Sequence, residues 1–165
     1  MDYVELRKEV TEAGLLERQY GYYAFKMAFN FALLALCIFI LATVNNFALQ
    51  LLNAVFLAFV TAQFGFVMHD AVHDSVFKGK KRNMLLSFFT GGTMMQVSAS
   101  SWGDKHNQHH SAPNHAEDDP DIRMPILAFT KEQALEKRGI AKFVVRYQAY
   151  AWLFIMLLPG FSMRL

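Results

Sequence analysis

The chain has few charged residues and a single cysteine. Cys37 stands alone among 165 residues, which excludes an internal disulfide and a zinc site built from cysteines. Charged residues make up 18% of the chain and hydrophobic residues 54%, whereas soluble domains contain about 25% charged residues. This composition excludes a disordered chain and disfavours an ordinary soluble domain. The 16 basic and 14 acidic residues nearly cancel, so nothing favours a nucleic acid as partner.

Charge is missing altogether from one long segment. No Lys, Arg, Asp or Glu occurs between Lys26 and Asp70, which leaves 43 uncharged residues. One membrane span needs about 20 apolar residues, so the segment is long enough for two. We predict a transmembrane helical hairpin with spans over residues 27–44 and 47–68, which the pair Asn45-Asn46 separates. A further uncharged run, residues 147–163, predicts the start of a third membrane helix.

The basic residues predict how this hairpin is oriented. Basic side chains precede it and follow it, whereas the Asn45-Asn46 turn has none. Because cytosolic flanks of membrane proteins are enriched in Lys and Arg, we expect the N-terminus and the segment after the hairpin to be cytosolic. The charged, amphipathic residues 2–23 predict a helix at the membrane surface. The expected fold is an all-α, multi-pass integral membrane protein, a single domain over residues 1–165 with cytosolic helices that carry histidines.

All six histidines lie within 47 residues, at spacings that suit metal binding. His69 and His73 are four residues apart, so on a helix they lie on one face. His106, His109 and His110 follow an i, i+3, i+4 pattern that confines their rings to an arc of about 100°. Five imidazoles exceed the four ligands of a structural zinc, which favours two metal ions or a redox-active centre. Imidazole binds iron, zinc, copper and nickel alike, so the metal stays open at this point.

Two acidic residues stand next to the first histidine pair. Asp70 follows His69 and Asp74 follows His73. Carboxylates that accept hydrogen bonds from ligating imidazoles orient those ligands, and this is one interpretation of both residues. A solvent-exposed helix edge explains them equally well.

These residues resemble the histidine boxes of the membrane fatty acid desaturases. His-Asp-Ala-Val-His (residues 69–73) matches the HxxxH box of that family. His-Asn-Gln-His-His (residues 106–110) begins 33 residues after the first box and matches HxxHH. Trp102 ahead of the second box, and Asn114 with residues 119–121 after it, also resemble what surrounds that box. The likeness covers most of the chain.

The resemblance implies an oxidoreductase that uses O₂ and two electrons to place a cis double bond in an acyl chain. It implies two iron ions, with the five box histidines as ligands and His115 as a sixth candidate. The substrate would be a lipid or an acyl thioester. Electrons would come from a separate ferredoxin or cytochrome b5, because the N-terminus lacks the His-Pro-Gly-Gly signature of a fused cytochrome b5 module.

The resemblance also suggests roles near the second box. Trp102 is a candidate for contact with the acyl chain, with an anchor at the membrane interface as the alternative. Asp118, Asp119 and Asp121, with Pro120 between them, are expected to order a turn or cap a helix rather than to bind metal. The third histidine box of the family is absent, so we expect the N-terminal part of a desaturase, a fragment or a truncated product, that holds iron incompletely.

Three alternatives stay open. A related membrane di-iron hydroxylase has similar boxes and produces an alcohol in place of an alkene. A metal-binding or transport protein without redox chemistry is the second alternative. Transport would place ionisable ligands inside the spans, and residues 27–68 and 147–163 contain no histidine or carboxylate. A non-catalytic remnant has the same sequence features as a fragment.

Overall fold

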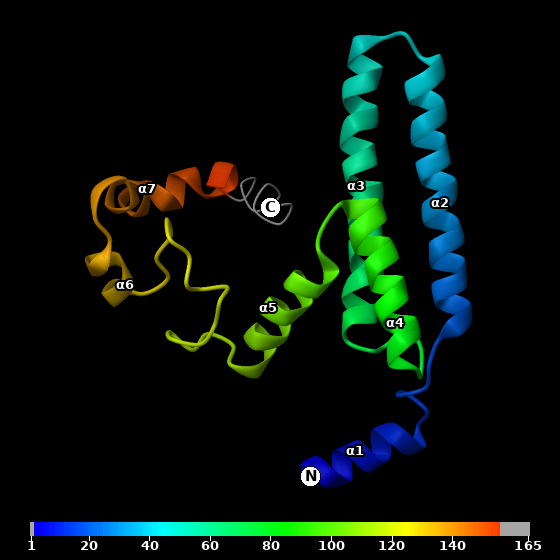
Figure 1. Cartoon of the computed structure of the whole chain (residues 1–165), viewed down its shortest axis with the longest axis horizontal. Helices are drawn as coiled ribbons and strands as arrows, with labels where there is room; N and C mark the ends of the chain where they lie inside the picture. Colours follow the sequence, from blue (N-terminus) through cyan, green and yellow to red (C-terminus); the bar gives the residue numbers. More distant parts are fainter. Residues whose placement is uncertain (1, 156–165) are drawn as a thin grey trace. The chain divides into compact units, whose positions relative to one another are not determined.

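The computed structural model describes residues 2–155, and every regular element in that range is a helix (Figure 1). The chain divides into two compact units, the first ending at Met95 and the second beginning at Gln96. The first unit contains α1 (Tyr3–Glu12), α2 (Tyr20–Thr43), α3 (Phe47–Val72), α4 (Lys80–Ser87) and the π-helical segment η1 (Phe88–Met95). The second contains α5 (Ala99–Ser111), α6 (Lys131–Glu136) and α7 (Gly139–Ile155).

Helices α2 and α3 form an antiparallel hairpin whose turn lies at Asn45-Asn46, where the sequence predicts it (Figure 1). Asn46 caps α3, because its Oδ1 accepts a hydrogen bond from the amide of Leu49 at 3.0 Å. Gln50 Nε2 donates to the carbonyl of Val44 at 2.6 Å and to that of Ile40 at 3.1 Å. The side chain of Gln50 therefore binds carbonyl groups at the end of α2, where the Ile40 carbonyl also accepts from the amide of Val44.

The two helices extend beyond the predicted spans. Helix α2 begins at Tyr20 and α3 ends at Val72, so the charged residues that bound the predicted spans, Lys26 and Asp70, lie inside helices. A charge limits the apolar span but not the backbone hydrogen bonding of a helix. Helix α3 therefore continues into the first histidine box and ends at Val72, with His73 as its C-cap residue.

The core of the first unit lies between the hairpin helices. Cys37, Val60 and Phe64 form its buried cluster, and Asn53 Nδ2 donates to the buried carbonyl of Cys37 at 3.0 Å. Helix α4 and η1 pack along α3 (Figure 1). A Cβ atom at Gly65 would lie 2.7 Å from Met95 Sδ, so glycine lets η1 approach α3 closely at this point.

The outer surface of the hairpin is apolar. Within residues 2–155, α2 and α3 are the two helices that are long and apolar enough to cross a membrane. Large side chains point outward along both of them, including Phe25, Phe39 and Phe59. A soluble protein rarely exposes so large an apolar surface, and a lipid environment removes it from water.

The other predicted helices differ in extent. Helix α1 ends at Glu12, before a glycine with positive φ, Gly14, and thus covers only the first part of the predicted amphipathic segment. Helix α7 begins at Gly139, ahead of the predicted third span, and is described to Ile155. The remainder of that span, residues 156–163, lies outside the described residues.

Candidate metal centre

The first histidine box occupies the C-terminal end of α3. His69 lies in the last turn and His73 is the C-cap residue, so the helix brings both rings to one side with centroids 4.7 Å apart. The chain then leaves the helix through Asp74, whose φ of +53° is left-handed. Asp74 therefore marks the end of the helix, and its predicted contact with a ligating imidazole stays a prediction.

A tyrosine from the other hairpin helix reaches this box. Tyr23 Oη donates a hydrogen bond to Asp70 Oδ2 at 3.0 Å, and Asp70 Oδ1 lies 3.3 Å from His69 Nδ1. The carboxylate of Asp70 thus links α2 to the imidazole of His69. The sequence offered no signal for Tyr23, which is 47 residues away from Asp70.

We expect Tyr23→Phe to lower the free energy of unfolding by about 1.5–3 kcal/mol, because it removes a hydrogen bond to a charged group and leaves the ring in place. Tyr22→Phe is the matched control: the Tyr22 hydroxyl is exposed and bonds only weakly to Lys26 at 3.3 Å. Thermal unfolding in detergent compares the variants. Equal midpoints for both variants would show that the bond to Asp70 contributes nothing.

The second box lies on α5, and its histidines have different partners. Ser98 begins the helix as its N-cap, and the helix ends at Ser111. Gln108 and His109 bind the loop that returns along the helix over residues 118–121. The three box histidines lie within about 100° of one another around the helix. The loop therefore holds one edge of this histidine face, at His109.

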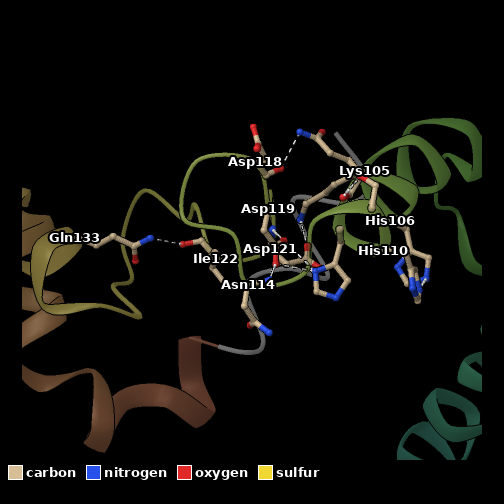
Figure 2. Close-up of polar contacts among 12 residues, drawn as sticks. Lys105, His106, His110, Asn114, Asp118, Asp119, Asp121, Ile122 and Gln133 are labelled. Carbon is tan, nitrogen blue, oxygen red and sulfur yellow. Dashed lines mark hydrogen bonds and ion pairs between the residues drawn. The ribbon is translucent and has the colours of Figure 1, made fainter.

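Trp102, His106 and His110, spaced four residues apart, form a column along α5. The Trp102 and His106 rings stack with centroids 4.3 Å apart and planes inclined by 17°. His106 Nε2 and His110 Nε2 lie 3.0 Å apart (Figure 2). Stacking on an imidazole is a role that the sequence did not predict for Trp102, and its predicted contact with substrate stays a prediction.

His109 is held by a buried carboxylate. Its Nδ1 lies 2.9 Å from both Oδ1 and Oδ2 of Asp119, a residue with no exposed surface. Asp119 also accepts hydrogen bonds from the amides of Asn114 at 2.7 Å and Asp121 at 2.8 Å (Figure 2). Asp119 thus orders a turn, as the sequence suggested, and also hydrogen-bonds His109 of the second box.

These contacts shift two pKa values in opposite directions. The hydrogen bond to Asp119 raises the pKa of His109 above 6.5, more than burial lowers it. Burial by itself raises the pKa of Asp119. The hydrogen bonds from His109, Asp121 and Asn114 outweigh burial and bring that pKa below 3.8. Asp119 is therefore an ionised acceptor at neutral pH, and the proton of the bond belongs to Nδ1 of His109.

The nitrogen atoms of the second box suit a transition metal. A metal such as zinc lies about 2.0–2.1 Å from an imidazole nitrogen, so two nitrogens on one ion are about 2.9 Å apart at a right angle and about 3.4 Å apart at the tetrahedral angle. His106 Nε2 and His110 Nε2 are 3.0 Å apart, a hydrogen-bonding contact that falls within this range. His109 uses Nδ1 for Asp119, which leaves Nε2 as its coordinating atom. The donor set of the box therefore fits a metal ion that prefers imidazole.

Comparison with known proteins assigns the chain to a sequence family. The family model described as "Fatty acid desaturase" matches residues 45–165, a segment that contains both histidine boxes and most of the chain. The chain belongs to the fatty acid desaturase family. No solved structure matches it.

Curated relatives carry desaturase names. A "Delta(8)-fatty-acid desaturase" of Euglena gracilis is 29% identical over 161 residues, which are 97% of this chain and 38% of the relative. An "Acyl-lipid (9-3)-desaturase" of Physcomitrium patens is 29% identical over 167 residues, 98% of this chain and 31% of the relative. A "Delta(6)-fatty-acid desaturase fat-3" of Caenorhabditis elegans is 29% identical and covers 87% of this chain and 33% of the relative. The chain thus spans about a third of the length of these relatives.

The sixth histidine of this desaturase-family chain lies outside both boxes. His115 is in the loop after α5, where its Nδ1 lies 3.0 Å from Asp118 Oδ2 and both side chains are largely exposed. Its membership of a ligand set stays a prediction. Besides Tyr23, sequence reasoning missed Asp119 as a partner of His109, since a contact between a helix and the irregular loop that follows it has no periodic signature.

Proposed function

We propose that this chain provides two of the histidine boxes of an O₂-dependent fatty acid desaturase. In this proposal the enzyme places a cis double bond in the acyl chain of a lipid or an acyl thioester. Membership of the desaturase family and the names of its relatives support that substrate class. The relatives' names differ in the double-bond position, so no position is carried over to this chain.

The observation that carries the proposal is the geometry of the second box. His106 Nε2 and His110 Nε2 lie 3.0 Å apart, while a buried carboxylate holds Nδ1 of His109. Histidines without a function on a helix surface would not require a buried carboxylate such as Asp119 to hold one of their rings. Carboxylate–histidine pairs of this kind recur at metal sites, where they orient the ring and raise its basicity.

We infer that the ligands of two iron ions include the five box histidines, His69, His73, His106, His109 and His110, with His115 as a sixth candidate. When bound, iron supplies the oxidation that removes two hydrogens from an unactivated acyl chain, with O₂ as oxidant and two electrons from an external ferredoxin or cytochrome b5. Neutral imidazoles hold the metal without cancelling its charge. Asp70 and Asp119 orient their imidazoles, and Asp74 is a further candidate for this role.

The hairpin supports a membrane location for the chemistry. Its exposed surface is apolar along both helices, which suits burial in lipid beside an acyl chain. Basic residues before the hairpin and at the start of α4 favour a cytosolic N-terminus and cytosolic boxes. A third membrane span near residues 147–163 and a single domain over residues 1–165 complete the proposed multi-pass arrangement.

Product analysis tests the proposed function. The coding sequence that contains these residues is expressed in a heterologous host that lacks the activity, and total lipids are converted to methyl esters for gas chromatography with mass spectrometry. We expect a fatty acid with two fewer hydrogens than its precursor, absent when His106 and His110 are both replaced by alanine. A hydroxylated acid would establish the hydroxylase alternative. Iron binding without any new product would indicate a non-catalytic metal protein.

A further inference from the structure

The carboxylate of Asp119 lies at the centre of the loop that follows α5. It has no exposed surface, and its oxygens accept from the amides of Asn114 and Asp121 as well as from the imidazole of His109 (Figure 2). Burying a charge is costly unless it is hydrogen-bonded. Three donors converge here on one carboxylate, so the loop is built around it.

The two neighbouring carboxylates cannot take its place. Asp121 Oδ1 pairs with Lys105 at 2.9 Å, and its other oxygen is 3.6 Å from His109 Nδ1, beyond hydrogen-bonding distance. Asp118 is exposed and pairs with His115. Asp119 is thus the one carboxylate of residues 118–121 that hydrogen-bonds the second box.

The loop holds this carboxylate against α5 at several points. Gln108 Nε2 donates to the carbonyl of Asp118 at 2.9 Å, which fixes the backbone one residue before Asp119. Asn114 adopts a left-handed φ of +61°, and its amide points at Asp119 Oδ2. Because the backbone on both sides of Asp119 is anchored, its oxygens keep a defined direction relative to the imidazole of His109.

We propose that Asp119 is a positioning residue that holds His109 as the Nδ1–H tautomer and so presents the Nε2 lone pair to a metal ion. The inference rests on the proposed function in one respect, that His109 is a metal ligand. Neutral imidazole carries its single proton on either nitrogen, and an ionised carboxylate only accepts. Asp119 therefore selects the tautomer before any metal binds.

Asp119→Asn separates this role from a purely structural one. The asparagine side chain has the same shape, and its Oδ1 still accepts from a backbone amide. One of the two oxygens near Nδ1 of His109 becomes an N–H donor, and the oxygen that is left is neutral and has a backbone amide to serve as well. The Nδ1–H tautomer thus loses its ionised acceptor, and we expect the proton to shift to Nε2, the nitrogen needed for the metal. Asp119→Glu keeps the carboxylate and serves as the conservative variant. Glu117→Gln, an exposed change in the same loop, is the matched control.

The first measurement is the tautomer of His109 in the full metal-free chain in detergent. Long-range ¹H–¹⁵N correlation at about pH 9, well above the ordinary imidazole pKa of about 6.5, shows which nitrogen carries the proton. We expect Nδ1–H in the wild type, in Glu117→Gln and in Asp119→Glu, and Nε2–H in Asp119→Asn. An Nε2–H signal in the wild type would overturn the inference even if Asp119→Asn failed to fold.

The second measurement is the affinity for ferrous iron, titrated without oxygen against a chromophoric chelator. We expect Asp119→Asn to weaken binding by about 10–100-fold at unchanged helix content, with Asp119→Glu between it and the wild type. Unchanged affinity in Asp119→Asn, together with an unchanged tautomer, would also overturn the inference. If His109→Ala binds iron as the wild type does, the ligand assignment in the proposed function fails, whereas the tautomer result stands independently.

Discussion

If the chain provides histidine boxes of a desaturase, as we propose, replacing His110 by alanine is expected to lower product by more than about 100-fold, since even residues that only orient ligands cost about 10–100-fold. His110 Nε2 lies 3.0 Å from His106 Nε2, so the change removes one of two nitrogens placed to bind together. His110 is exposed and alanine is the best helix former, so the helix itself remains. Product analysis of the expressed enzyme measures the effect, and iron content of the purified protein reports its cause.

Asn107→Ala provides the matched control for this substitution. Asn107 lies on α5 between the box histidines and is exposed, so its replacement tests whether any change in this turn disturbs the enzyme. We expect wild-type product and iron content. Full activity in His110→Ala, with Asn107→Ala also active, would remove His110 from the ligand set.

Replacing Phe64 by alanine is expected to lower the free energy of unfolding by about 3–5 kcal/mol. Phe64 is 1% exposed, and its ring packs edge-on against Phe31 of α2 with centroids 5.3 Å apart. Truncation leaves a cavity between α2 and α3, because the surrounding side chains relax only partly into the space of the lost ring. Reversible unfolding in mixed detergent micelles measures the loss.

The control for this prediction lies on the same helix. Phe59 is 57% exposed, so Phe59→Ala removes a ring of the same size from the outer surface of the hairpin. We expect a cost well below that of Phe64→Ala, since no closed cavity forms. Equal losses at the two positions would mean that burial between α2 and α3 does not stabilise the hairpin.

The hairpin was largely predictable because its signals are local. A charge-free segment and the Asn45-Asn46 pair depend on neighbouring residues alone, and Asn46 caps α3 through the amide of Leu49, three residues on. The bounds were less accurate. Helix α3 runs to Val72, past the first charged residue, because a helix ends where its hydrogen bonding ends and not where apolar sequence does.

The grouping of histidines was predictable for the same reason. Residues three and four apart lie on neighbouring positions of a helix, so His69 with His73, and His106 with His110, come together in any helical conformation. Trp102 and His106 are also four residues apart, so their proximity on the helix could have been predicted from their spacing. It went unpredicted because spacing indicates proximity and not what a side chain contacts.

By itself, the sequence determined the apolar hairpin, its turn and the helical faces that carry each histidine box. Only the tertiary structure decided which carboxylate supports which imidazole: Asp70, reached by Tyr23 from 47 residues away, and Asp119, ten residues after His109 in the chain. The physical reason is the range of the interactions. Helical periodicity depends on backbone geometry within one turn, whereas these hydrogen bonds form only after helix packing and loop closure bring distant groups within 3 Å or so of each other.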